Sequence, residues 1–182
     1  MGPYVSDLDM ARFQSKRNIL ISGDISRDTA VRVMLLLERM GEESPDSPIF
    51  LVMDSPGGDV QSGWSIIDAM AICPSPVNTV CFGECSSMAA VIFSCGAKGG
   101  RMMLPHSRLM IHQPWGGSFA SKESELREAS ERITRTRNEL ERQLSESSGN
   151  PLERIHSMCE SDFVMSAEEA VSLGFADSII VR

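Results

Sequence analysis

The sequence predicts an α/β fold, because short apolar segments with strand character alternate with amphipathic segments of helical length. The chain has 182 residues, of which 42% are hydrophobic, and this is enough to build one core. Residues 49–53 form an uninterrupted apolar run, a pattern typical of a strand that is buried on both faces of a parallel sheet. No linker or internal repeat divides the chain, so we expect a single domain over residues 1–182.

The order of elements follows from hydrophobic periodicity and from turn residues. The expected strands span residues 17–22, 49–53, 77–82, 101–104, 108–111 and 178–181. The expected helices span residues 26–39, 60–72, 87–95, 122–147 and 166–174. The last helix has an N-cap serine, Ser166, with a glutamate three residues later and a closing glycine.

The long charged helix has one apolar stripe. We expect this stripe to be exposed in a lone domain and therefore to need a partner. Its residues are Leu126, Ala129, Ile133, Leu140 and Leu144.

Composition excludes several classes of function. The net charge of −8 provides no basic surface for nucleic acid. The longest apolar stretch, residues 86–96, is too short to cross a bilayer, and residues 1–17 do not resemble a signal peptide, so we expect a soluble cytoplasmic protein, or one of an organelle stroma or matrix. The five cysteines include no CxxC pair and no histidine at metal spacing, which predicts reduced core thiols and no metal.

Ser87 is the candidate nucleophile for a hydrolytic reaction. It follows an expected strand and opens an apolar helix, where free amides and the positive helix end favour a developing negative charge. The amide of Met88 and the glycine pair Gly57-Gly58 can supply donors to an oxyanion. Each signal is weak alone, because a serine at a helix start is usually only a cap and Pro-Gly-Gly is usually only a turn.

The candidate base is one of three histidines. His112 ends an apolar strand, from which its ring can reach across a cleft, although a histidine satisfied within the core is the commoner use of such a position. His106 lies in an expected turn, and His156 lies on a polar helix whose solvated face it is expected to share.

The candidate acid is Asp162. The apolar residues 163–165 follow it, and they would leave its carboxylate beside hydrophobic packing. An ion pair, or a cap on the helix at Ser166, is the alternative role of Asp162.

Four motifs together strongly resemble the proteolytic subunit of the Clp protease. They occur in the order of that family and cover nearly the whole chain. The motifs are Ser55-Pro56-Gly57-Gly58, residues 83–90 around Ser87-Met88, residues 104–114 followed by Gly116-Gly117, and Asp162 with residues 165–170.

The resemblance implies a role for each site residue. The nucleophile of the family falls on Ser87, its general base on His112 and its acid on Asp162, and its oxyanion donors fall on the amides of Gly58 and Met88. By this resemblance the chain is a serine endopeptidase that hydrolyses unfolded polypeptides and short peptides through an acyl-enzyme, without a cofactor or a metal.

The resemblance also implies an architecture and partners. Family members adopt a crotonase-like ββα spiral, in which residues 18–118 and 148–182 would form a head and residues 119–147 a protruding handle helix. The handles join two heptameric rings of a homo-oligomer, and a second type of proteolytic subunit can share the complex. A ring-shaped AAA+ ATPase of the Clp family feeds in polypeptide, so ATP is used by that partner; this chain has no P-loop motif.

The sequence departs from the family pattern at several positions. Ala89 replaces the usual glycine, and Ser161 replaces an arginine that ties rings together in many members. Phe50 and Val52 stand where tyrosines more often help to form the ATPase docking pocket. The sequence therefore supports catalysis more strongly than docking of an ATPase. We expect the contact between rings to rest on helix packing more than on an ion pair.

Two alternative functions remain. A non-catalytic structural subunit of a mixed ring would share the fold, but such subunits typically lack a triad residue. A crotonase-type acyl-CoA enzyme would need glutamates in its cleft instead of a serine nucleophile. The presence of Ser87, His112 and Asp162 favours the peptidase over both.

Overall fold

The computed structural model describes residues 6–114 and 123–181, and it confirms the predicted α/β class. The strands are β1 Asn18–Ser22, β2 Ile49–Ser55, β3 Val77–Ser86, β4 Arg101–Met103, β5 Arg108–Ile111, β6 Phe163–Ser166 and β7 Ser178–Ile179. The helices are α1 Asp7–Gln14, α2 Arg27–Glu43, α3 Val60–Ile72, α4 Met88–Ser94, α5 Glu123–Ser148, α6 Leu152–Cys159 and α7 Ala167–Ser172.

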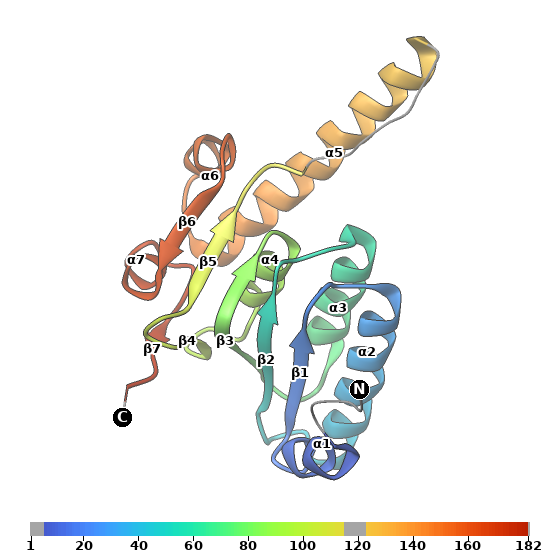
Figure 1. The fold of residues 1–182 in the computed structure, drawn as a ribbon, viewed down its shortest axis with the longest axis vertical. Coiled ribbons are helices and arrows are strands. Elements are labelled where there is room, and N and C mark those ends of the chain that lie inside the picture. Colours follow the sequence, from blue (N-terminus) through green and yellow to red (C-terminus); the bar gives the residue numbers. More distant parts are fainter. Residues whose placement is uncertain (1–5, 115–122, 182) are drawn as a thin grey trace.

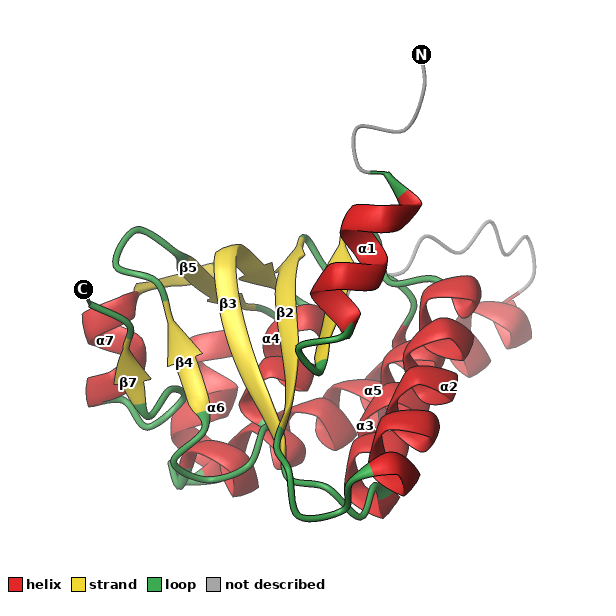
Figure 2. Cartoon of the chain, turned by 90° about the horizontal axis from the view of Figure 1, so that it is seen from below, coloured by secondary structure: helices red, strands yellow, loops and turns green. Residues whose placement is uncertain are grey.

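The strands form one sheet in the order β1-β2-β3-β4-β7, with every neighbouring pair parallel. β5 also pairs in parallel with β3, and β6 pairs antiparallel with β5. Figure 2 shows α2, α3 and α5 on one side of this sheet and α1 on the other. Because β2, β3 and β5 run in the same direction, the segments that follow their carboxyl ends meet at one edge of the sheet.

Two helices begin where side chains cap them. Asp59 accepts a hydrogen bond from the amide of Ser62 at 2.8 Å and thereby starts α3 directly after the glycine pair. The hydroxyl and amide of Ser62 also hold the pKa of Asp59 below its ordinary value. At α7, Ser166 and Glu169 form the capping box that the sequence predicted.

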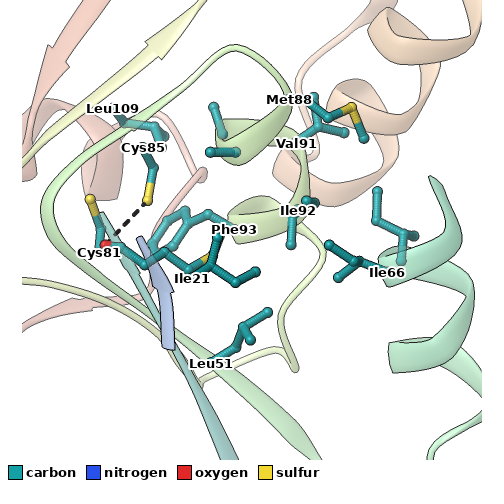
Figure 3. Packing of buried hydrophobic residues seen from close by; sticks show 14 of the residues in the cluster. Ile21, Leu51, Ile66, Cys81, Cys85, Met88, Val91, Ile92, Phe93 and Leu109 are labelled. Carbon is teal, nitrogen blue, oxygen red and sulfur yellow. Dashed lines mark hydrogen bonds between the residues drawn. The ribbon is translucent and has the colours of Figure 1, made fainter. Parts of the chain in front are cut away.

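The core lies between the sheet and the helices that cover it. Every residue of α4 is buried, and Phe93 packs close to Ile21 and Leu51 of the sheet (Figure 3). The five cysteines are free thiols, as expected, although Cys73 and Cys95 are only partly buried. None of the described helices combines the length and the apolar character that a membrane span requires. A helix as buried as α4 gives the residue at its start a rigid support.

The long helix predicted over residues 122–147 is α5, whose amino-terminal half extends away from the sheet in Figure 1. The expectation that its whole stripe would be exposed is wrong. Leu140 and Leu144 are buried in the core of this chain, and Ala129 is also buried, whereas Ile133 is partly buried and Leu126 is 52% exposed. Of the stripe, only Leu126 is largely exposed, and the contact of this helix with a second ring stays a prediction.

Three features of the fold were not predicted. α1 buries none of its residues, so it has no apolar stripe that periodicity could reveal. β6, with four residues, was not among the expected strands. β3 continues to Ser86 through an irregularity in its pairing with β2, where Gly83 has a φ of 99°. The amide of Glu84 donates there to Asp54 Oδ1 at 3.1 Å, which holds the irregular segment in place.

Candidate active site

Ser87 stands at the sharp turn between β3 and α4. Its φ of 56° and ψ of −125° are unusual for a residue with a side chain. Its amide donates to the carbonyl of Met110 at 2.9 Å, and its own carbonyl accepts the amides of Ala90 and Val91. The Ser87 hydroxyl makes no capping hydrogen bond to α4, so the alternative role of Ser87 as a helix cap does not apply. A fixed and strained turn whose serine Oγ does not cap the helix is the geometry expected of a nucleophile.

The glycine pair lies directly against this turn. A Cβ on Gly57 would come within 2.7 Å of Ser86 O and of Ser87 Cβ, and the φ of Gly57 is 102°, so only glycine fits. The same Cβ would lie 3.0 Å from the amide nitrogen of Met88. Gly58 has a φ of 146°. The structure therefore brings the two predicted oxyanion segments together.

The two predicted donor amides are available. The Gly57 carbonyl accepts the amide of Ile25 at 2.7 Å, and the Asp59 amide donates to the Ile25 carbonyl at 2.8 Å. Between these bonds, the Gly58 amide has no acceptor within the part of the chain that the structure describes. Met88 is the first residue of α4, a position whose amide has no partner inside the helix.

His112 follows the last residue of β5 and is directed at Ser87. Its Nε2 lies 2.8 Å from Ser87 Oγ, and its side chain is 14% exposed. The hydrogen bond between the Ser87 amide and Met110 fixes the register between the serine turn and β5. Since Met110 is two residues before His112, this register brings the imidazole to the hydroxyl.

Asp162 lies just before β6, on the other side of His112. Its Oδ1 is 3.5 Å from His112 Nδ1, which is longer than a good hydrogen bond. Ile111 pairs with Phe163 in the antiparallel ladder. His112, which follows Ile111, therefore lies opposite Asp162, which precedes Phe163. The expectation of hydrophobic packing around this carboxylate is wrong, because its side chain is 74% exposed.

The three side chains open onto one cleft of about 700 Å³. Gly57, Gly58 and Asp24 also line it. A much smaller cavity of about 20 Å³ lies behind Ser87 and His112, with apolar walls from α3, α4 and α5. The cleft is open enough for an extended chain, and the cavity offers apolar contact beside the hydroxyl.

The other two histidines do not reach Ser87. His156 is half exposed, as expected for a solvated face, and its Nδ1 also lies 2.8 Å from Oε2 of the buried Glu141. Cys159 lines the small cavity, and burial, with a smaller contribution from the Glu141 carboxylate, raises its pKa to about 12. This cysteine is therefore an inert thiol near neutral pH, and the hydroxyl of Ser87 is the candidate nucleophile of the site.

Comparison with known proteins agrees with the motifs. The sequence profile of the family described as Clp protease matches residues 5–182. The ATP-dependent Clp protease proteolytic subunit of Streptococcus suis (strain 98HAH33) is 36% identical over 171 residues, which are 93% of this chain and 87% of that protein.

This chain belongs to the Clp protease family. Membership makes the chain a peptidase, which confirms the resemblance and sets aside the acyl-CoA enzyme. It also implies oligomeric assembly together with Clp ATPases. The α/β fold with its central sheet is consistent with the fold of the Clp protease family.

Sequence reasoning missed a group of residues beside the site. Arg137 and Glu141 of α5 line the small cavity together with Ser87 and His112. Their spacing of four residues on a helix was a signal for an ion pair, and the structure shows this pair at 2.6 Å. That it lies next to His112 depends on tertiary packing, which no local pattern reveals.

Proposed function

We propose that the chain is the proteolytic subunit of a Clp-type compartmental protease, a serine endopeptidase that hydrolyses unfolded polypeptides and short peptides. Ser87 is the nucleophile, His112 the general base and Asp162 the group that orients the imidazole. The observation that carries this proposal is the 2.8 Å approach of His112 Nε2 to Ser87 Oγ in an open cleft. Membership of the Clp protease family supports the same function.

In the acylation step, Ser87 Oγ attacks the carbonyl carbon of the scissile peptide bond while His112 Nε2 accepts the hydroxyl proton. The electron pair of the carbonyl moves onto its oxygen. The amides of Gly58 and Met88 donate hydrogen bonds to that oxyanion, and because they are fixed before reaction they need no reorganisation.

The intermediate then collapses. The His112 imidazolium gives its proton to the leaving nitrogen, the C–N bond breaks, and the acyl group stays on Ser87 as an ester. Water attacks the ester while His112 accepts its proton, the bond between the acyl carbon and Ser87 Oγ breaks, and His112 returns the proton to Oγ as the second product leaves. Throughout, Asp162 holds the Nδ1–H tautomer of His112. Acid lowers turnover, because a protonated His112 cannot accept the serine proton.

We further propose that the chain forms a homo-oligomer of two stacked heptameric rings. The projecting half of α5 exposes Leu126, an apolar side chain that a second ring would cover. Substrate polypeptide is delivered by a Clp ATPase, which uses ATP in place of this chain. Assembly of this kind would enclose the Ser87 clefts in a chamber.

The test is the variant Ser87→Ala with a matched control. Loss of the nucleophile is expected to reduce peptide turnover by roughly 10⁶-fold, to below detection. The neighbouring Ser86→Ala should remain active, because the Ser86 hydroxyl donates a hydrogen bond to the side chain of Glu84 and has no role in the proposed mechanism. A fluorophosphonate probe should label the wild type and Ser86→Ala but not Ser87→Ala, as measured by intact mass.

Two outcomes would contradict the proposal. Turnover by purified Ser87→Ala near the wild-type rate, with contamination excluded, removes Ser87 from the role of nucleophile. An assembled wild-type chain that neither cleaves peptides nor takes up the probe favours the structural subunit of a mixed ring.

A further inference from the structure

A charged cluster at the base of α5 lies beside the site and has no part in the mechanism above. Glu141 is buried, with 3% of its surface exposed. Arg137 Nε donates to Glu141 Oε1 at 2.6 Å, and His156 Nδ1 lies 2.8 Å from Glu141 Oε2. Arg137 Nη2 lies 3.4 Å from His156 Nε2 and closes the cluster. Each carboxylate oxygen thus has its own donor.

The contacts assign the protons of this cluster. His156 Nδ1 faces a carboxylate, so it carries a hydrogen, and His156 Nε2 faces a guanidinium, so it accepts one. A buried carboxylate that lost its cationic partner would be costly, so Glu141 holds the guanidinium of Arg137 in one orientation.

One donor of Arg137 is directed out of the cluster toward the site. Its Nη1 lies 3.3 Å from Oε1 of Gln113, the residue that directly follows His112. Gln113 also donates through Nε2 to the carbonyl of Glu160 at 3.2 Å. If the Gln113 amide were flipped, its NH₂ group would face the guanidinium of Arg137 and its oxygen would face the carbonyl of Glu160, and neither hydrogen bond could form. These two contacts therefore fix one orientation of the Gln113 side chain.

Gln113 joins the two segments that carry the base and the acid. Its backbone amide donates to the carbonyl of Cys159 at 2.8 Å, in addition to the side-chain bond to Glu160. Asp162 follows only two residues later. Because the Asp162 carboxylate is exposed, its 3.5 Å approach to His112 depends on where these backbone segments are held and not on side-chain packing.

We propose that Arg137 is a positioning residue for peptide hydrolysis. Held by Glu141 and His156, it fixes the side chain of Gln113 and thereby the separation between His112 and Asp162. This inference rests on the proposed function of the triad. Arg137 acts through Gln113, so its loss lowers the rate of the chemical step more than the binding of substrate.

The experiment is a double-mutant cycle on the assembled full chain, with Arg137→Gln, Gln113→Ala and the double variant. Each single variant should lower kcat for a fluorogenic peptide about tenfold and leave KM within about twofold. Because both act through the same contact, the double variant should be no slower than the slower single variant. Single variants with kcat within about twofold of the wild type, or losses that multiply in the double variant, overturn the proposal.

Two further variants distinguish a positioning role of Arg137 from a purely structural one. Asp177→Asn breaks another partly buried ion pair, with Arg101, and should lower the Tm without lowering kcat. Arg137→Lys keeps a cation near Glu141 but lacks the fork that reaches Gln113 as well, so it should restore Tm and not kcat. If Arg137→Lys restores both, the cluster serves stability alone and the proposal is overturned.

The remaining outcomes are also decisive. If Arg137→Gln does not fold, Gln113→Ala alone decides, because the Gln113 side chain is exposed and its removal leaves the backbone bond to Cys159 in place. Active Ser87→Ala would refute the proposed function. Inactive Ser87→Ala together with fully active Gln113→Ala would refute only the role of Arg137.

Discussion

The two ends of the candidate triad are built in different ways. The Ser87 end comes from the interior, where a strained turn stands between a central strand and a helix whose residues are all buried. The Asp162 end lies in the link between α6 and β6 and is 74% exposed. The contact of His112 with Ser87 is 2.8 Å, and its contact with Asp162 is 3.5 Å.

This difference shows that one site can have a part fixed by the core and a part fixed by local hydrogen bonds. Close packing resists displacement of the serine turn, so Ser87 and the amides of Met88 and Gly58 keep their geometry. The acid has no such packing around its carboxylate. Its position depends on the pairing of β5 with β6 and on the bonds of Gln113.

The largest effect that tests this comparison is that of Asp162→Asn. If the exposed acid orients His112 as in other triads, the amide holds the wrong tautomer and kcat falls by about 10⁴-fold. Glu160→Gln is the matched control, because it neutralises an exposed carboxylate nearby and leaves the bond from Gln113 to the backbone intact. Steady-state peptide hydrolysis measures both, and a loss below tenfold in Asp162→Asn would mean that the looser contact does not serve catalysis.

The next effect tests the core-built end. Gly57→Ala places a methyl group against Ser86 O and Ser87 Cβ, and the displaced turn should lower kcat by about 100-fold. Gly23→Ala is the control, since Gly23 also has a positive φ, 76°, but an added Cβ there meets nothing within 4 Å. It carries the backbone strain without the clash. Equal losses in the two variants would show that strain, and not the approach of Gly57 to Ser87, is the cause.

The sequence predicts the Ser87 end of the site better than the Asp162 end. The turn at Ser87, the glycine pair and His112 all follow parallel strands, and strand patterns are visible as apolar runs, so these residues could be placed at one edge of the sheet. The capping box at Ser166 is equally local and was predicted to the residue. Such features need only short-range information.

The features that the sequence did not predict depend on tertiary packing. The exposure of Asp162, the cluster of His156 with Glu141, and the burial of Leu140 and Leu144 are set by how α5 and α6 pack on the sheet. Neither periodicity nor composition distinguishes a stripe that covers its own core from one that meets a partner. The sequence therefore predicted the surroundings of Ser87 more completely than those of Asp162.

A smaller effect compares the packing beneath the two ends. Leu144 is 2% exposed and lines the cavity behind Ser87, so Leu144→Ala should cost about 2–5 kcal/mol of unfolding free energy. Val164 of β6 is 56% exposed, and Val164→Ala should cost less than about 0.5 kcal/mol. Denaturant unfolding at matched protein concentration measures both, because assembly shifts apparent stability. Similar costs would mean that the Asp162 end is as firmly packed as the Ser87 end.

The smallest effect is a pH dependence that separates the fold from the site. Hydrogen bonds from Arg101, with the amides of Arg101 and Gly99, hold the pKa of Asp177 below its ordinary value. The stability that Asp177 provides is therefore complete above about pH 4, where the unfolded carboxyl is ionised, and is lost as pH falls through the lower folded pKa. The Tm difference between wild type and Asp177→Asn should be largest near pH 7 and should narrow toward pH 3. Turnover that falls equally in both proteins as pH decreases belongs to His112 and the site, whereas a Tm difference that stays constant to pH 3 would remove Asp177 from the account of acid stability.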